Sequence, residues 1–262
     1  MNWLNKAKIL VGVLSGIGLF ASCSSDTEEL LNESGTGFVS FSIQANTGFQ
    51  TTRTIDENDY ENVDNYTVQI LQGNKIVGDS CEWEYSKLPD EIELPNGEYT
   101  LKAFYGKEEA ISSTAPYVEG TKDFEVSSNL QKVEVSCKPT SAKVSVEFDE
   151  KMDEYFSDYS VSITTKALTK GQTWGKDDSE DIYYLKVEEK EQIKMEISLT
   201  NKETDESFKS TKTYTVSPGD YKNYTIAPKA SESDDGSLSI TISFNDETTD
   251  HEVDITIPAD WK

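Results

Sequence analysis

The chain has 262 residues, with 49 aspartates and glutamates against 24 lysines and arginines, and a formal net charge of −25 at pH 7. A surface this acidic repels nucleic acid and anionic lipid headgroups, because binding to either depends on clustered lysine and arginine. The composition therefore excludes a nucleic-acid partner.

Residues 1–22 are typical of a secretory signal peptide that ends in front of a cysteine. Two lysines precede an uncharged apolar run at residues 9–20, and two small residues then lead into Cys23. A basic segment, a short apolar core and small residues before a cut site are the features of such peptides. The run is too short to span a bilayer, which takes about 20 apolar residues.

Cys23 is the predicted lipidation site. Small residues before a cysteine are what a lipoprotein signal peptidase accepts, so Cys23 would become the acylated first residue of the mature chain. The alternative is that an ordinary signal peptidase cuts nearby and leaves Cys23 as a stray thiol. Two or three acyl chains anchor a protein stably where one does not, so we expect a protein anchored to a membrane that it does not cross.

Residues 23–35 are predicted to form an acidic tether behind the lipid. Asp26, Glu28 and Glu29 lie within six residues of Cys23. This cluster resembles the signal that sends Bacteroidetes lipoproteins to the outer face of the outer membrane, and the resemblance implies a lipid-anchored protein that faces the cell exterior. The alternative is a solvated tether without a sorting role.

Apolar and polar residues alternate with a period of two through most of the remaining chain. The alternating runs lie at residues 39–45, 66–70, 99–105, 144–148, 159–163, 193–199, 238–244 and 253–257. Such runs predict half-buried antiparallel strands, and many of them separated by Gly, Pro, Asn and Asp turns predict β-sandwiches. We expect an all-β fold of two tandem antiparallel β-sandwich domains, at residues 36–139 and 140–262, with the junction at Pro139.

Two turns suggest that the second sandwich repeats the first. Pro95 and Gly97 precede the run at 99–105, and Pro218 and Gly219 precede another strand. Proline presets the first turn position and glycine tolerates the positive dihedral that follows. We therefore interpret the two turns as counterparts in a weak internal repeat.

One segment departs from the period of two. Met152, Tyr155 and Phe156 stand at i, i+3 and i+4 behind acidic residues that suit a helix N-terminus. This spacing predicts a short helix that covers the core of the second sandwich.

Several segments resemble a known family. These are the cysteine with its acidic tether, GFVSFSI, TTRT, YTVQI, ELPNGEYTLKAF, APYVEGTKDFEV and VEVSCKPTSAKVSVEF, which together cover residues 20 to about 165. They resemble a group of Bacteroidetes surface lipoproteins catalogued only as a domain of unknown function. That group is similar to the fimbrillin-like proteins, so the resemblance implies transthyretin-like (immunoglobulin-like) β-sandwiches and implies neither an enzymatic activity nor a ligand site.

The resemblance makes Arg53, in TTRT, a candidate site of proteolytic processing. It is the only arginine in the chain and lies between the first and second predicted strands. In some fimbrillin-like proteins a protease cuts after an arginine in this kind of position and removes the first strand, and the next subunit's strand fills the groove by strand addition. The alternative is a loop arginine that pairs with Asp56 or Glu57.

Two cysteines remain after lipidation. Cys81 and Cys137 each share strand parity with apolar residues, so both are expected in a core. Because the secreted environment permits disulfides, two interpretations stay open, a Cys81–Cys137 bridge or two buried free thiols.

Motifs of catalysis and of metal binding are missing. The sole histidine, His251, lies beside Asp250 and Glu252 at the start of the last predicted strand, which is typical of a solvated polar residue and provides no base for a nucleophile. There is no zinc-ligand spacing. Residues 56–64 offer alternating oxygens for calcium but lack the glycine of the EF-hand loop, so a solvated acidic loop is the favoured interpretation. We expect no enzyme, no cofactor and no metal.

Trp174 is the remaining candidate for ligand contact. It lies in a long polar connection between predicted strands, where Gly171 and Gly175 argue against a regular element. An exposed tryptophan on a loop could stack on a sugar ring, and the alternative is that Trp174 folds back to cap the core.

The sequence therefore favours a non-catalytic cell-surface lipoprotein that acts as an adhesin or fimbria-associated subunit, with other surface or fimbrial subunits as partners. The alternative is a carbohydrate-binding accessory lipoprotein of a glycan-uptake system.

Overall fold

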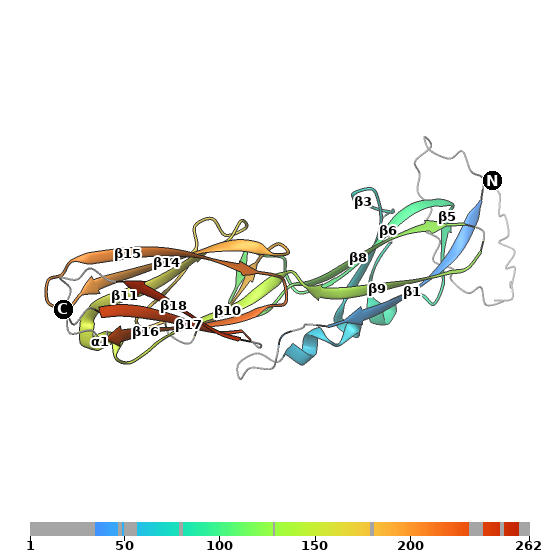
Figure 1. Cartoon of the computed structure of the whole chain (residues 1–262). Coiled ribbons are helices and arrows are strands. Elements are labelled where there is room, and N and C mark those ends of the chain that lie inside the picture. The colour runs from blue at the N-terminus through green and yellow to red at the C-terminus, as the bar shows by residue number, and fades with distance from the viewer. Residues whose placement is uncertain are drawn as a thin grey trace, which may run out of the picture.

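The computed structural model describes residues 35–46, 49, 57–78, 81–127, 129–178, 181–230, 238–246 and 249–256 of the chain. Two lobes of β-strands lie end to end along one long axis, and the chain passes from one to the other between β9 and β10 (Figure 1). Strands with short turns make up most of the described chain, and the expected all-β fold with one short α-helix is confirmed.

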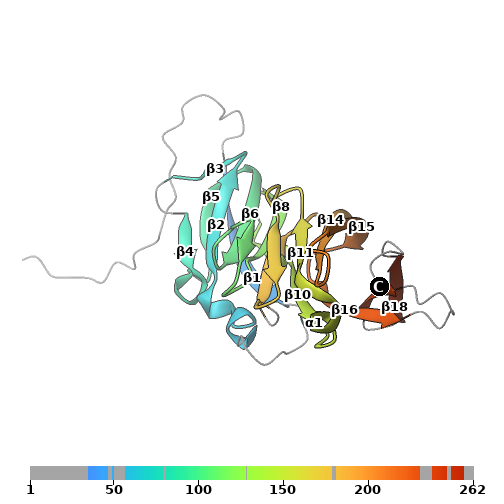
Figure 2. The same cartoon turned by 90° about the vertical axis from the view of Figure 1, so that its left-hand side faces the viewer.

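The N-terminal lobe consists of one sheet that folds into two layers. Its strands are β1 (Thr36–Ala45), β2 (Thr67–Gln72), β3 (Lys75–Ile76), β4 (Glu82–Glu84), β5 (Ile92–Pro95), β6 (Gly97–Tyr105), β8 (Val118–Val126) and β9 (Gln131–Pro139), with 3-10 turns at Glu57–Tyr60, Val63–Asn65 and Tyr85–Lys87. The order is β3-β2-β6-β8-β9-β1-β5, with β4 paired to β2. Figure 2 shows β2, β6 and β8 side by side.

The fold between the two layers lies where β8 meets β9. These strands pair at Val118–Pro139 and Glu119–Lys138, next to the exit toward the second lobe. Beyond this corner β9, β1 and β5 form one layer and the remaining strands form the other. Apolar side chains from both layers fill the core, among them Val39, Val68, Ile70, Ile92, Leu94, Leu101, Val133 and Val135.

The C-terminal lobe is a sandwich of two separate sheets. Its elements are β10 (Ser141–Phe148), α1 (Met152–Tyr155), β11 (Phe156–Thr164), β12 (Gln172–Gly175), β13 (Ile182–Lys186), β14 (Glu191–Asn201), β15 (Ser207–Val216), β16 (Tyr221–Ala230), β17 (Leu238–Asp246) and β18 (Thr249–Thr256). One sheet has the order β18-β17-β16-β10-β13-β7, in which β7 is Ile111–Ser112, and the other has the order β12-β11-β14-β15. A single core lies between them, with Val144, Val146, Val161, Ile163, Met195, Ile197, Tyr224 and Ile226 among its members.

The predicted helix is confirmed as α1, and it covers this second core. Met152 is fully buried in the core, and its backbone N–H donates to the Asp149 oxygen. Phe156, expected on the helix, begins strand β11 instead and still reaches the same core.

The strand pairing repeats between the lobes. In the N-terminal lobe β1 pairs antiparallel with β5 and parallel with β9, and in the C-terminal lobe β10 pairs antiparallel with β13 and parallel with β16. In the other layers β4-β2-β6-β8 corresponds to β12-β11-β14-β15. In this comparison the hairpin of β17 and β18 in the C-terminal lobe has no counterpart among the described strands of the N-terminal lobe.

The two turns that suggested the repeat are not counterparts, and that interpretation was wrong. The turn with Pro95 and Gly97 connects β5 to β6, whereas Pro218 and Gly219 connect β15 to β16, which corresponds to the step from β8 to β9. Gly219 has a φ of 87°, a conformation that glycine tolerates best. A proline and a glycine therefore occur in two connections that do not correspond between the lobes. For this reason the residue types alone gave a wrong prediction of the repeat.

The N-terminal half of the sequence also supplies a strand to the second lobe. Strand β7 (Ile111–Ser112) pairs with β13 at the edge of its sheet, with Leu185 opposite Ile111. Beside this pair the Lys186 N–H donates to the Ala110 oxygen at 3.0 Å, and the Lys186 ammonium pairs with Glu108. The lobes are thus joined by more than the connection from β9 to β10.

Candidate functional site

Strand β1 is the middle strand of its layer. It pairs with β5, where Val39 lies opposite Ile92, and with β9, where Ala45 lies opposite Cys137. Val39 is fully buried and Ile43 is 7% exposed, so β1 contributes to the core as well as to the ladder. If β1 left, β5 and β9 would each expose an unpaired backbone edge, and another strand could fill the slot between them.

The two residues predicted to be processed, Cys23 and Arg53, lie outside the described residues. By sequence, Arg53 falls in the connection from β1 to β2. A cut there would leave β1 attached to the rest of the protein through non-covalent contacts alone.

One such contact is made by Phe49, four residues beyond the end of β1. Its ring is 8% exposed and lies against the ring of Tyr184, with centroids 5.5 Å apart at an angle of 62°. The ammonium of Lys143 lies 5.9 Å from the ring centroid of Phe49, 5.9 Å from that of Tyr184 and 5.3 Å from that of Tyr221. We call Lys143, Tyr184 and Tyr221 the Lys143 cradle.

The Lys143 cradle balances an unfavourable burial. Lys143 is fully buried, and burying an ammonium costs free energy unless other groups compensate for its lost water. Aromatic faces attract a cation by about 2 kcal/mol or more where water is excluded. Nothing in the alternating pattern of the sequence indicated this site, because β10 was expected to carry a solvated polar face on the side of Lys143.

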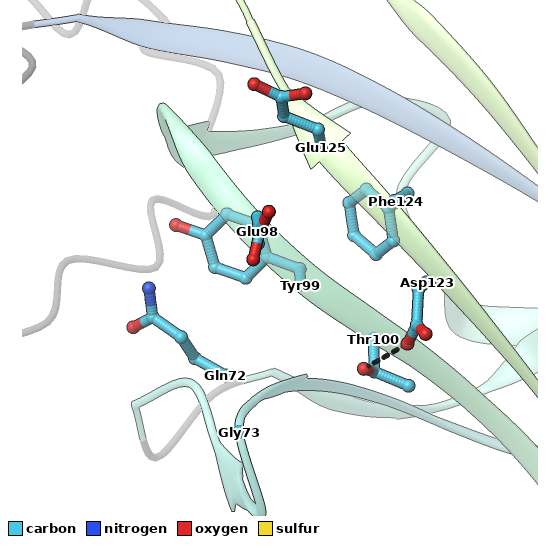
Figure 3. Close-up of a pocket in the computed structure, with 8 residues that line it drawn as sticks. All are labelled: Gln72, Gly73, Glu98, Tyr99, Thr100, Asp123, Phe124 and Glu125. Carbon is cyan, nitrogen blue, oxygen red and sulfur yellow. Dashed lines mark hydrogen bonds between the residues drawn. The ribbon is translucent and has the colours of Figure 1, made fainter.

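A hollow of about 770 Å³ opens beside β6 and β8 in the N-terminal lobe (Figure 3). The residues that line it are Gln72, Gly73, Glu98, Tyr99, Thr100, Asp123, Phe124 and Glu125. Tyr99 and Phe124 lie opposite each other on the two strands with stacked rings, centroids 5.7 Å apart. Phe41 of β1 packs edge-on against Phe124 at 5.5 Å, so β1 supports this aromatic pair.

Polar groups also line the hollow. The Thr100 hydroxyl donates to Asp123 at 2.7 Å (Figure 3), and the Tyr99 hydroxyl donates to the Pro95 oxygen at 3.0 Å. Burial raises the pKa of Tyr99 above its ordinary value. An aromatic face beside carboxylate and amide groups is the kind of surface that binds a polyhydroxylated ligand, and sequence inspection missed it because β6 and β8 are adjacent only in the sheet.

A second polar group, at the corner between the layers, joins three side chains. The Tyr117 hydroxyl donates to Glu119 at 2.6 Å, and the Lys102 ammonium lies 2.8 Å from the same carboxylate. Burial opposes ionisation of Glu119, but the hydrogen bonds from Lys102 and Tyr117 outweigh it and hold the pKa of Glu119 below its ordinary value. Burial and this carboxylate raise the pKa of Tyr117. This arrangement ties β6 to β8.

Trp174 is not available for ligand stacking, so that expectation was wrong. It is fully buried in the core of the C-terminal lobe, on β12 rather than on a loop. Buried Trp174 follows exposed Thr173, which is the alternation of burial typical of a strand. The backbone of β12 pairs with β11. The other interpretation, that Trp174 caps the core, is confirmed.

The Cys81–Cys137 bridge does not form either. Cys137 is a buried free thiol whose Sγ donates to the Ala103 oxygen at 3.5 Å. Cys81 precedes β4 and belongs to a different cluster of the core, so parity with apolar residues placed both side chains inside without making them neighbours. Burial, with a smaller contribution from Glu119, raises the pKa of Cys137 to about 12.

Other candidates give no site within the described ranges. There, no group of three or more His, Cys, Asp or Glu side chains is arranged to hold a metal ion. His251 lies on β18 opposite Phe244, and its side chain is outside the described part. In the portion of the chain that the structure describes, no helix has the length and apolar character to cross a membrane.

Comparison with known proteins gives one family and a set of distant structural likenesses. The family model described as "Domain of unknown function (DUF4493)" matches residues 35–259. The search of curated proteins gave no match.

Solved structures that resemble the chain include proteins from Bacteroides and Parabacteroides species. A candidate cell adhesion protein from Bacteroides eggerthii is 10% identical, with a TM-score of 0.42 over 80% of this chain and 95% of that one. A fimbrial assembly protein from Parabacteroides distasonis is 11% identical, with a TM-score of 0.39 over 84% of this chain and 98% of that one. At TM-scores below 0.5 these likenesses carry no argument about this chain.

Proposed function

The chain belongs to the DUF4493 family of domains of unknown function, whose description names no activity. From the chain itself, we propose that the protein is a non-catalytic cell-surface lipoprotein that serves as an adhesin or fimbria-associated subunit. Cys23 carries the lipid, the acidic tether follows it, and the protein faces the cell exterior from the outer membrane. Its partners are other surface or fimbrial subunits. The two sandwiches at residues 36–139 and 140–262 are its domains.

The observation that carries this proposal is the place of β1. The strand lies between β5 and β9 and buries Val39 in the core, yet it is the first strand of the described residues and is followed by the only arginine of the sequence. A cut after Arg53 would turn a central strand into a separate segment. A strand of a neighbouring subunit could then replace β1, with main-chain hydrogen bonds supplying strength and the core positions supplying specificity.

The test is the mass and N-terminus of the protein recovered from its native outer membrane. A chain that starts at acylated Cys23 supports the anchor, and an additional N-terminus at Thr54 identifies Arg53 as a processing site. The Cys23→Ala variant should lose both the acyl mass and the membrane fraction. A mature chain with an unmodified Cys23 would contradict the lipoprotein anchor.

Assembly is tested separately on whole cells. Heat-labile ladders on gels that disappear in the Arg53→Ala variant would indicate assembly by strand exchange. Ladders that persist in Arg53→Ala would assign assembly to an uncut anchor subunit. If neither ladders nor adhesion to host cells or matrix is found under any growth condition, the proposed role is wrong.

A second candidate is glycan binding, which the hollow in Figure 3 favours. Trp174 is excluded as its stacking residue, so Phe124 takes that role, with Gln72 as a hydrogen-bonding group. Titration of neutral host and dietary glycans against Phe124→Ala tests the idea, with Phe38→Ala as the control because Phe38 is 41% exposed and lies outside the hollow. Binding that survives Phe124→Ala would reject this site.

A further inference from the structure

We propose that Phe49 and the Lys143 cradle form a clasp that holds the end of the first strand on the C-terminal lobe. The clasp adds a non-covalent link between β1 and the second half of the protein, and it stands whether or not Arg53 is cut. It makes the C-terminal lobe a binding surface for an aromatic residue that follows the strand in the slot between β5 and β9.

The cradle is a row of three side chains across three strands. Lys143 on β10 lies opposite Tyr184 on β13 and opposite Tyr221 on β16. Because successive residues of a strand point to opposite faces, and Val144 belongs to the core, the row lies on the outer face of the six-stranded sheet. An outer face is normally solvated, yet Lys143 is fully buried and Tyr184 is 1% exposed.

Phe49 contacts two residues of the cradle from the N-terminal side. Its ring lies on Tyr184 and within cation–π range of Lys143. A planar ring covers the ammonium and also offers it a negative face, whereas an aliphatic side chain would cover it without that attraction. The cradle therefore favours an aromatic residue over an aliphatic one of similar size.

The chain between β1 and Phe49 is short. Ala45 is the last residue paired with β9, and the Asn46 N–H donates to the Cys137 oxygen at 3.2 Å. In Figure 1 the end of β1 points toward the C-terminal lobe. Since Phe49 is only three positions after Asn46, seating of the ring restrains the C-terminal end of β1. Release of the ring allows that end to fray first.

Hydrogen exchange followed by mass spectrometry of the full chain tests the clasp. In Phe49→Ala, amides of residues 42–45 should exchange about tenfold faster or more, since local opening sets the exchange rate. Amides of β14, remote from the clasp, should be unchanged. The control is Phe38→Ala, which removes an exposed ring from the same strand and should leave residues 42–45 unaffected.

A double-mutant cycle separates the clasp from general packing. Lys143→Met keeps the length of the side chain and removes its charge. If the clasp is correct, Phe49→Ala in the Lys143→Met background accelerates β1 exchange by less than about threefold, because the partner is already missing. Fully additive effects, or exchange of β1 that Phe49→Ala leaves unchanged, would overturn the proposal.

A conservative variant covers the case in which Phe49→Ala destabilises the whole protein. Phe49→Leu retains apolar burial and loses the aromatic face, so a local acceleration at residues 42–45 supports the clasp. Equal acceleration in all strands in both variants would assign Phe49 to general core packing and reject the clasp.

Discussion

The indole Nε1 of Trp174 donates a hydrogen bond of 2.9 Å to the backbone oxygen of Asp181. Trp174 lies on β12 in one sheet of the C-terminal sandwich, and Asp181 directly precedes β13 in the other sheet. The ring of Tyr183 meets the indole edge-on with centroids 5.4 Å apart. The indole thus fills the core and ties the two layers at one edge.

Replacing Trp174 by Ala should lower the free energy of unfolding by about 3–5 kcal/mol, the range for removal of a large buried aromatic side chain. Urea unfolding followed by circular dichroism measures the change. The matched control is Thr173→Ala on the exposed face of β12, which should stay within about 0.5 kcal/mol of wild type. A stability loss below about 1 kcal/mol for Trp174→Ala would contradict its place in the core.

The period of two predicted some of the strands in both lobes. It predicted β1, β6, β11 and β14 because each of these strands has one face on a core and one face on solvent. Such a strand has an alternating sequence of apolar and polar residues. It was insufficient for β12, because a strand of four residues, Gln172–Gly175, carries too few positions to show a period.

Residue contacts between distant segments could not be predicted in the same way. Lys143 alternates with Val144 and so was placed on a solvated face, but it is buried, and one ring that it meets is that of Phe49, nearly a hundred positions earlier in the sequence. Cys137 and Cys81 both face inward, but the strand order that separates them is a property of the sheet. The hollow likewise depends on the adjacency of Tyr99 and Phe124 across β6 and β8.

Cys137 should react with a thiol reagent at pH 8 only after the protein unfolds. Its pKa of about 12 leaves very little thiolate, and its Sγ is enclosed by the core. Peptide mapping after timed treatment with a disulfide reagent measures the rate. Ser136→Cys in a Cys137→Ala background is the control, because residue 136 is exposed and should be modified at least about 100-fold faster.

The same thiol makes a contribution to the pH dependence of stability. A thiol whose pKa rises on folding from the ordinary 9.0 to about 12 stabilises the folded state below pH 9, and this contribution is lost as the pH rises through about 12. Cys137→Ala should therefore show a smaller fall in the urea midpoint between pH 9 and pH 11 than wild type. An identical or steeper fall would contradict the raised pKa.

Glu119 should contribute to the pH dependence of stability in the acid range, with a sign opposite to that of Cys137. Because Lys102 and Tyr117 hold its pKa below the ordinary 4.5, its contribution is present above that pH and is lost as the pH falls through the lower folded value. At pH 7, Glu119→Gln should cost about 0.5–1 kcal/mol, which is less than an enclosed charged hydrogen bond contributes, because water partly screens this pair. The difference from wild type should shrink as the pH falls below 4.5, and Glu98→Gln, an exposed carboxylate, serves as control. A difference that grows toward acid would contradict this assignment.

Gly120 should be intolerant of any side chain, because β9 approaches it closely just beyond the corner between the layers. A Cβ at Gly120 would lie 2.5 Å from the backbone oxygen of Ser136, and a backbone oxygen cannot move away as a side chain can. Gly120→Ala should therefore separate β8 from β9 and cost about 1–3 kcal/mol, the range for overpacking a fitted core. Gly175→Ala is the matched control in the other lobe, since its Cβ would meet only a side-chain oxygen of Asp178 at 3.3 Å. Urea unfolding of both variants decides the question, and equal stabilities would show that the corner can open without cost.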